Sequence, residues 1–281
     1  MRGASRASLA ELKERLAAEL PEPTRADETA SQVARTAAAL GEELFAFVHL
    51  LDREHGLRRT LSDPARSADQ KAALVRALLE GKVAAAAAEL AAAAAALRWS
   101  RPRDLTDAVE QLAVMAHLIS AEAQGKLDDL EDELFRFGRV VAAEPRLRGA
   151  LSDPSAAPER KRALLAELLE AKVTEPTLRL ITEAAQYPRG RSLDRSLDEY
   201  ALLAAERRQR LVAVVRTATE LTGTQRSRLA AALAETYGHE VHLNVVLDPG
   251  VIGGLSVEVG GEVIDATVAS RLKTLRRRLA G

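Results

Sequence analysis

Apolar residues recur at helical spacing over roughly the first 210 positions of the chain. The first predicted helix ends before Pro21, because proline lacks a backbone donor and blocks further helical bonding. Its buried face is formed by four leucines that lie three or four residues apart: Leu9, Leu12, Leu16 and Leu20. The same spacing continues to about residue 209 and indicates a series of amphipathic helices.

Alternation of apolar and polar residues replaces the helical spacing after about residue 210, which indicates short strands. The predicted elements, in order, are a strand at 211–217, a helix at 225–237, strands at 241–247, 255–259 and 262–264, and a final helix at 266–279. We therefore predict a mostly α fold with a small C-terminal α/β module of β-α-β-β-α order.

The helical part contains an internal repeat with an offset of ninety residues. Residues 57–83 and 147–173 agree at 14 of 27 positions without a gap. Upstream, E-L-F-x-F at 43–47 matches E-L-F-x-F at 133–137. We interpret this as two tandem helical-bundle units, at 1–100 and 101–209, followed by the module at 210–281. Each unit is expected to close a hydrophobic core of its own.

Composition and motifs argue against several classes of function. The chain has no cysteine, which excludes disulfides and thiolate metal sites, and its net charge of −1 argues against a dedicated nucleic-acid binder. His239 and His242 open a predicted strand, where an odd offset places them on opposite faces, so they do not form a metal site. We find no catalytic constellation, no cofactor-binding motif and no metal-ligand set, and we expect no cofactor.

Several segments in the second half of the chain carry a resemblance to a known family. They read L-S-D-P at 151–154, V-R-T-A-T-E-L-T-G-T-Q at 215–225, D-P-x-x-I-G-G at 248–254 and V-I-D-A-T at 263–267. In this order they resemble the delta subunit of F-type ATP synthases, whose mitochondrial relative is the oligomycin-sensitivity-conferring protein. The family motif falls on Leu151, Asp153, Pro154, Asp248, Pro249, Ile252, Gly253, Gly254 and Asp265.

The chain departs from the family pattern in three places. Thr217 stands where the family prefers serine, and Ala266-Thr267 replaces Gly-Ser. The unit at 1–100 resembles an extra copy of the family's helical domain. This extra unit and the many alanines resemble actinobacterial delta subunits.

The resemblance implies a non-catalytic stator element of the peripheral stalk. It implies that the helical domain holds the alpha subunits of the catalytic head and that the C-terminal module holds the b subunit. Such a protein resists rotor torque during proton-driven ATP synthesis, at the cytoplasmic face of the cell membrane, and contacts the membrane only through its partners. An alternative is a free-standing helical scaffold or adaptor unrelated to ATP synthase.

Two surfaces are predicted to bind these partners. The helices near 104–124 and 174–187 each carry more apolar positions than one bundle face needs, so they are candidates for the alpha-subunit interface. The candidate residues there are Leu112, Met115, Ile119, Leu178, Ile181 and Tyr187. The final helix combines an apolar stripe with a basic edge and is the candidate for the b-subunit interface. Its candidate residues are Leu272, Leu275, Arg276, Arg277 and Leu279.

Overall fold

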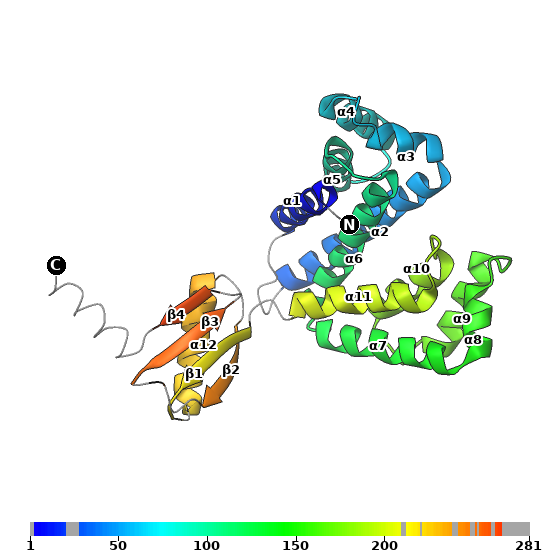
Figure 1. Ribbon diagram of the computed structural model, residues 1–281. Helices are drawn as coiled ribbons and strands as arrows, with labels where there is room; N and C mark the ends of the chain where they lie inside the picture. The colour runs from blue at the N-terminus through cyan, green and yellow to red at the C-terminus, as the bar shows by residue number, and fades with distance from the viewer. Residues whose placement is uncertain are drawn as a thin grey trace. The chain divides into compact units, whose positions relative to one another are not determined.

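The computed structural model describes residues 3–20, 28–208, 212–219, 221–237, 241–247, 251, 253–259 and 262–265. The chain divides into two compact units, Met1–Ala205 and Glu206–Gly281. The first is helical and the second contains a small sheet, so the fold is mostly α with a sheet near the C-terminus, as predicted (Figure 1).

Eleven helices are described up to Arg208. They are α1 (Ala4–Glu19), α2 (Glu28–Arg53), α3 (His55–Ser62), α4 (Ala68–Leu79), α5 (Ala85–Ala96), α6 (Pro102–Ala123), α7 (Leu127–Ala143), α8 (Pro145–Ser152), α9 (Pro158–Leu169), α10 (Glu175–Gln186) and α11 (Leu193–Arg208).

The helices repeat at the same offset as the sequence. The bounds of α8, α9 and α10 lie ninety residues after those of α3, α4 and α5. A polar contact repeats as well, because Glu43 accepts a hydrogen bond from the backbone N–H of Ala84 at 3.0 Å and Glu133 accepts one from that of Thr174 at 2.9 Å. Both carboxylates lie at the N-terminus of a helix, where backbone N–H groups have no intrahelical partner.

A single hydrophobic core runs through both repeats, from Leu12 on α1 to Ala204 on α11. The expectation of a separate core for each unit is therefore wrong. The physical reason is α6, on which every side chain from Asp104 to Ala121 is buried except Asp107 and Gln111. A helix that is buried all round packs against neighbours on every side. Here those neighbours come from both repeats: α1, α2, α3, α5, α7 and α10.

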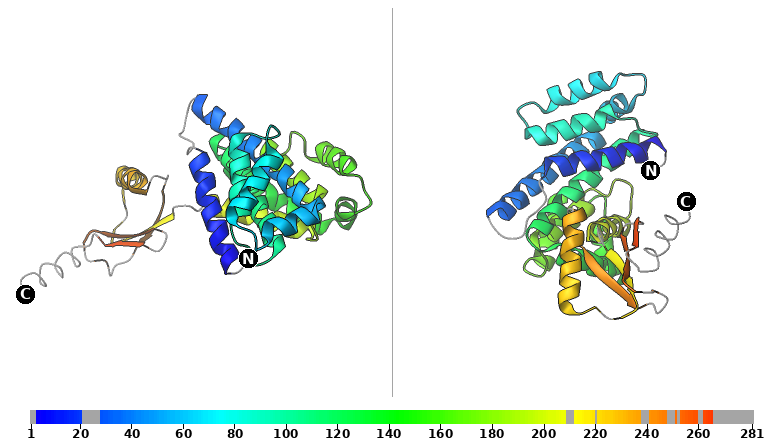
Figure 2. Two further views of the ribbon diagram at one scale, coloured as in Figure 1. Left: turned by 90° about the horizontal axis from the view of Figure 1, so that it is seen from above. Right: turned by 90° about the vertical axis from the view of Figure 1, so that its left-hand side faces the viewer.

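Of the described helices that contact α6, α2 packs against it most extensively and lies along it (Figures 1 and 2). Phe45 and Val48 on α2 are fully buried, as are Leu105 and Leu112 on α6. Burying a side chain of this size stabilises a fold by about 1.5–3 kcal/mol. The α2–α6 contact is thus a major part of the core.

The second unit contains β1 (Val212–Thr217), α12 (Gly223–Tyr237), β2 (His242–Leu247), β3 (Leu255–Val259) and β4 (Glu262–Asp265). The sheet order is β2-β1-β3-β4; β1 and β2 are parallel and the other pairs are antiparallel. A parallel pair needs a crossover, and α12 provides it (Figure 2). The small core contains Val215, Leu233, Val241 and Val257. The predicted helix at 266–279 lies outside the described residues.

Candidate functional site: the ion-paired junction of α2, α6 and α10

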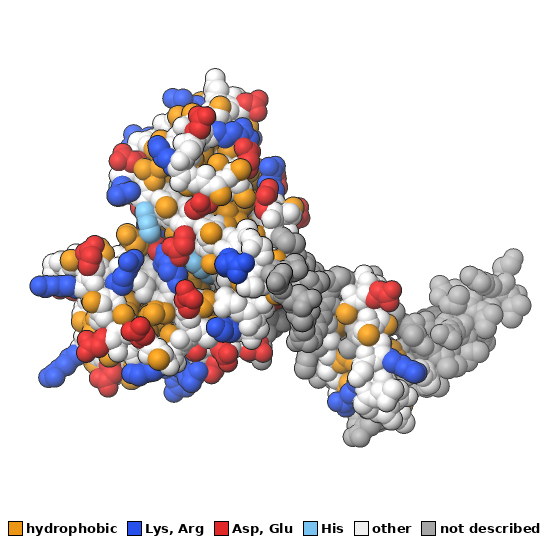
Figure 3. Space-filling model, turned by 180° about the vertical axis from the view of Figure 1, so that it is seen from behind, with side chains coloured by type: hydrophobic (Ala, Val, Ile, Leu, Met, Phe, Trp, Pro, Cys, Tyr) orange, Lys and Arg blue, Asp and Glu red, His pale blue; other side chains and the backbone are white. Residues whose placement is uncertain are grey.

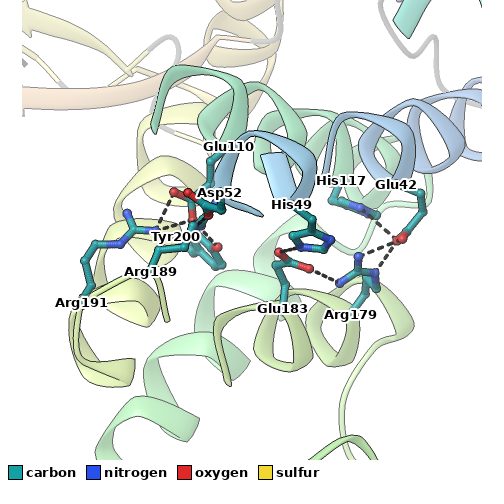
Figure 4. Close-up of polar contacts among 10 residues, drawn as sticks. All are labelled: Glu42, His49, Asp52, Glu110, His117, Arg179, Glu183, Arg189, Arg191 and Tyr200. Atoms are coloured by element: carbon teal, nitrogen blue, oxygen red, sulfur yellow. Dashed lines mark hydrogen bonds and ion pairs between the residues drawn. The ribbon is translucent and has the colours of Figure 1, made fainter. Parts of the chain in front are cut away.

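Charged and polar side chains from four helices and one loop meet beside the α2–α6 contact (Figure 4). We call this set the junction. It comprises Glu42, His49 and Asp52 on α2, Glu110 and His117 on α6, Arg179 and Glu183 on α10, Arg189 and Arg191 in the loop before α11, and Tyr200 on α11.

An aromatic ring marks the centre of the α2 side of the junction. Phe45 is fully buried, and its ring stacks on the imidazole of His117 with the two ring centres 5.6 Å apart. The guanidinium of Arg179 lies over the same ring, 5.0 Å from its centre. A cation over an aromatic face is attracted by the negative face of the ring. Phe45 thus joins α2 to both α6 and α10.

Glu42 contacts nitrogen groups of two neighbouring helices, α10 and α6. Arg179 donates to both of its carboxylate oxygens, one of the bonds being 2.8 Å long, and His117 Nε2 lies 3.4 Å away. Partial burial acts to raise the pKa of Glu42. The hydrogen bonds and charges of His117 and Arg179 together outweigh it and hold the pKa at about 2. The carboxylate is therefore ionised at all ordinary pH values.

Glu183 is almost fully buried and lies between two nitrogen groups. His49 Nε2 is 2.7 Å from one of its oxygens, and Arg179 donates to the other at 3.1 Å. The ring of His49 also stacks on Tyr187, with centres 3.6 Å apart. This carboxylate therefore joins His49 of the first repeat to Arg179 of the second.

Glu110 forms the third part of the junction and is also almost fully buried. It accepts hydrogen bonds from Tyr200 Oη at 2.7 Å and from Arg191 at 2.5 Å and 2.6 Å, and it pairs with Arg189. Burial raises the pKa of the Tyr200 phenol and lowers the pKa of the Arg189 guanidinium. A buried charge with this many partners is satisfied, whereas removal of a partner is costly.

The candidate alpha-subunit residues lie next to this junction. Leu112, Ile119 and Ile181 are buried in the core, and Met115 is only 8 % exposed. Leu178 and Tyr187 are half-buried. The structure thus gathers these residues on α6 and at α10 but covers most of them with the chain's own helices, notably α2.

The described family-motif residues have structural roles. Leu151 is buried, and Asp153 accepts hydrogen bonds from the backbone N–H and the hydroxyl of Ser155 at 2.8 Å and 2.7 Å, which fixes the turn after α8. Pro154 follows in that turn, and Asp265 ends β4. Gly253 and Gly254 have φ angles of 64° and 86°, which glycine adopts readily. The remaining motif and b-interface residues lie outside the described part: Asp248, Pro249, Ile252, Leu272, Leu275, Arg276, Arg277 and Leu279.

Sequence reasoning missed the junction itself. One signal was present, because Glu110 is the single acid in the stretch 108–116, where every other residue except Gln111 is apolar. A lone acid at such a position needs a buried cation. The partners could not be found from spacing, since Arg189 and Arg191 follow about eighty residues later in a loop.

The chemistry of the junction is that of a structural contact. Each of its carboxylates is paired with at least one cation or imidazole, and the described parts of the chain contain no group of three potential metal ligands. On the face shown in Figure 3, acidic and basic side chains are interspersed over the helical unit. None of the described helices is long and apolar enough to span a bilayer. These features define a helical protein whose charged groups join its own elements.

Comparison with known proteins identifies the family. The family described as "ATP synthase delta (OSCP) subunit" matches residues 114–279. The delta subunit of Thermobifida fusca is 48% identical over 281 residues, covering all of both chains. That of Streptomyces coelicolor is 48% identical over 280 residues, covering 100% of this chain and 98% of the relative, and that of Acidothermus cellulolyticus is 42% identical over the full length of both.

The chain therefore belongs to the ATP synthase delta (OSCP) subunit family. It is a non-catalytic, structural subunit of the peripheral stalk of F-type ATP synthase. The similarity to these actinobacterial members extends through the first hundred residues, which lie outside the segment that the family match covers.

Proposed function

We propose that this chain connects the alpha subunits of the catalytic head to the b subunit of the stalk. Located at the cytoplasmic face of the cell membrane, it prevents the head from rotating with the rotor. The observation that carries this proposal is the continuous core of Met1–Ala205, cross-linked by buried ion pairs. A part that resists torque must not deform, and close-packed interiors deform little.

We further propose the following organisation of the chain. Residues 1–100 form the extra helical unit, 101–209 the family-type helical unit, and 210–281 a β-α-β-β-α module. The shared ninety-residue offset of three helix pairs supports the duplication. The two helical units differ from independent domains because α6 belongs to the core of both.

The helical part is proposed to bind the alpha subunits and the C-terminal module to bind the b subunit. Of the predicted alpha contacts, Leu178 and Tyr187 retain exposed surface beside the junction and fit a partner helix best. Leu112, Met115, Ile119 and Ile181 support that surface from beneath. For the b subunit, the apolar stripe and basic edge predicted at 266–279 remain the candidate surface.

Reconstitution tests this function. Catalytic heads stripped of this subunit are mixed with the soluble part of the b subunit, with and without the full-length chain. The chain is expected to make the two co-sediment. If neither the heads nor the b subunit binds it, the chain is a free-standing scaffold instead. Reversing Arg276 and Arg277 to Glu is expected to slow association with the b subunit only.

A further inference from the structure

The two repeats carry the same three-residue pattern on their second helix. An acid is followed three residues later by phenylalanine and four residues after that by a cationic or ionisable nitrogen side chain. The pattern reads Glu42, Phe45, His49 on α2 and Asp132, Phe135, Arg139 on α7, with an offset of ninety residues throughout. Positions three and four apart share one face of a helix, so each set forms a single face.

In the first repeat the whole face is docked. Phe45 lies between His117 and Arg179, Glu42 pairs with Arg179, and His49 contacts Glu183. Two of these partners are on α10, where a basic residue is followed four positions later by a carboxylate. The α2 face thus binds α10, whose Arg179 pairs with Glu42 and whose Glu183 contacts the imidazole of His49 (Figure 4).

In the second repeat the corresponding face is open. Phe135 is 57% exposed, whereas Phe45 is 0% exposed. The guanidinium near its ring, that of Arg139 at 6.0 Å, belongs to the same helix. Asp132 pairs with Arg136 of its own helix at 3.2 Å, and both side chains are 65% exposed. Aromatic rings and arginines are enriched in protein interfaces, and the charged groups beside this ring contact side chains of their own helix.

We propose that this α7 face, formed by Asp132, Phe135 and Arg139, docks an amphipathic helix of the catalytic head. The helix carries a basic residue and, one turn further on, a carboxylate beside its apolar stripe, as α10 does. This inference rests on the proposed function and locates one of its contacts.

The occupant follows from the correspondence between the repeats. Asp132 corresponds to Glu42, which binds Arg179, so the partner helix is expected to carry a basic side chain opposite Asp132. Arg139 corresponds to His49, which contacts Glu183, so a carboxylate is expected opposite Arg139. Phe135 between them calls for apolar contact or a guanidinium plane, as Phe45 receives. Charges matched in this order also set the direction in which the helix lies.

Binding of the full-length chain to stripped catalytic heads tests the site. Phe135→Ser is expected to raise the Kd about tenfold, because a buried aromatic anchor is a typical hot spot. Leu74→Ser on α4 is the matched control, since Leu74 is also exposed, at 40%; it is expected to change the Kd less than about twofold. Unfolding midpoints of both variants should match that of the wild type, since neither side chain is in the core.

The outcomes separate this inference from the proposed function. If the wild type binds heads and Phe135→Ser binds equally well, the α7 face is not a docking site. If the wild type itself does not bind, the proposed function fails and the site with it. The double reversal of Asp132→Lys and Arg139→Glu should weaken binding as Phe135→Ser does, and binding at the wild-type level would refute the charge pattern.

Photocrosslinking identifies the occupant. A benzophenone side chain at position 135 in the full-length chain is expected to crosslink to a helical segment of a head subunit, and peptide mass spectrometry locates it. A crosslink to residues 206–281 of the same chain, or to a second copy, would overturn the proposed occupant.

Discussion

Gly41 on α2 lies directly against His117 on α6: a β-carbon at residue 41 would stand 2.7 Å from both Nε2 and Cδ2 of the imidazole. The backbone oxygen of Ala113 would be only 3.1 Å away. The absence of a side chain at this position therefore lets the two helices approach closely enough for Phe45 to stack on His117.

Gly41→Ala is expected to destabilise the chain by about 1–3 kcal/mol, because the added methyl group must push α2 away from α6 or displace a buried imidazole. Urea unfolding followed by circular dichroism measures the change. Gly138→Ala on α7 is the matched control, since nothing lies within 4 Å of its added β-carbon. That variant should gain about 0.5–1 kcal/mol from helix propensity, and a loss of equal size in both variants would contradict the close-approach argument.

Glu110→Gln is expected to cost about 3–5 kcal/mol, because it removes the buried anion that Arg189 and Arg191 share. Of the ion pairs among the described residues, Arg189 then keeps only that with Asp52, at 3.8 Å, and Arg191 keeps only that with the partly exposed Glu199. Glu89→Gln removes the partner of Arg76 in an exposed ion pair, where both side chains are more than half exposed. Its cost should be at most about 1 kcal/mol. If urea unfolding gives the same loss of unfolding free energy for both variants, the ion pairs of Glu110 do not stabilise the fold more than an exposed ion pair does.

The low pKa of Glu42 predicts a pH dependence of stability. A carboxyl group with a folded-state pKa of about 2, against an ordinary value of 4.5, contributes stability that is complete above about pH 4.5 and is lost as the pH falls toward 2. The difference in unfolding free energy between the wild type and Glu42→Gln should therefore shrink between pH 6 and pH 3.

Arg179→Met supplies the control for this experiment, because Arg179 is one of the groups that lower the pKa of Glu42. In that background the effect of Glu42→Gln should depend less on pH over the same range. An unchanged pH dependence would assign the stabilisation of the carboxylate to another group.

Removal of the first repeat is expected to disrupt the helical part of the second. A fragment of residues 101–281 loses α2, and with it the cover over the apolar side of α6. We expect it to bind a hydrophobic dye and to unfold over a broad range, whereas residues 1–205 alone should unfold cooperatively. Sharp thermal unfolding of the 101–281 fragment, with full helix content, would show that the second unit can close its own core.

The sequence predicts local structure well in this chain. Helical spacing and the ninety-residue offset locate the helices, and alternation locates the strands to within a residue or two, as β2 and β3 show. These features depend on neighbouring residues, so they can be read from a short window. Periodicity also reveals that α6 has more apolar surface than one bundle face requires.

What covers that surface could not be predicted, because the covering residues are distant in the chain. Glu42 and Arg179 are 137 positions apart, and neither stands in a recognisable motif. A second apolar stripe on a helix can pack against a helix of a partner protein or against another helix of the same chain, and the sequence does not distinguish the two. The sequence interpretation chose an external partner for residues such as Leu112 and Ile119, whose side chains are buried in the core of the helical unit.

The burial of α6 has a mechanical consequence. Two bodies joined by a linker pivot at that linker, but α6 contacts helices of both repeats along its length, so the helical unit has no pivot at their boundary. A load applied to one repeat moves the other by the same rotation, and little elastic energy is stored between them. Elastic twist imposed by the turning rotor must then be stored in other parts of the complex, while the helical unit acts as a rigid connection.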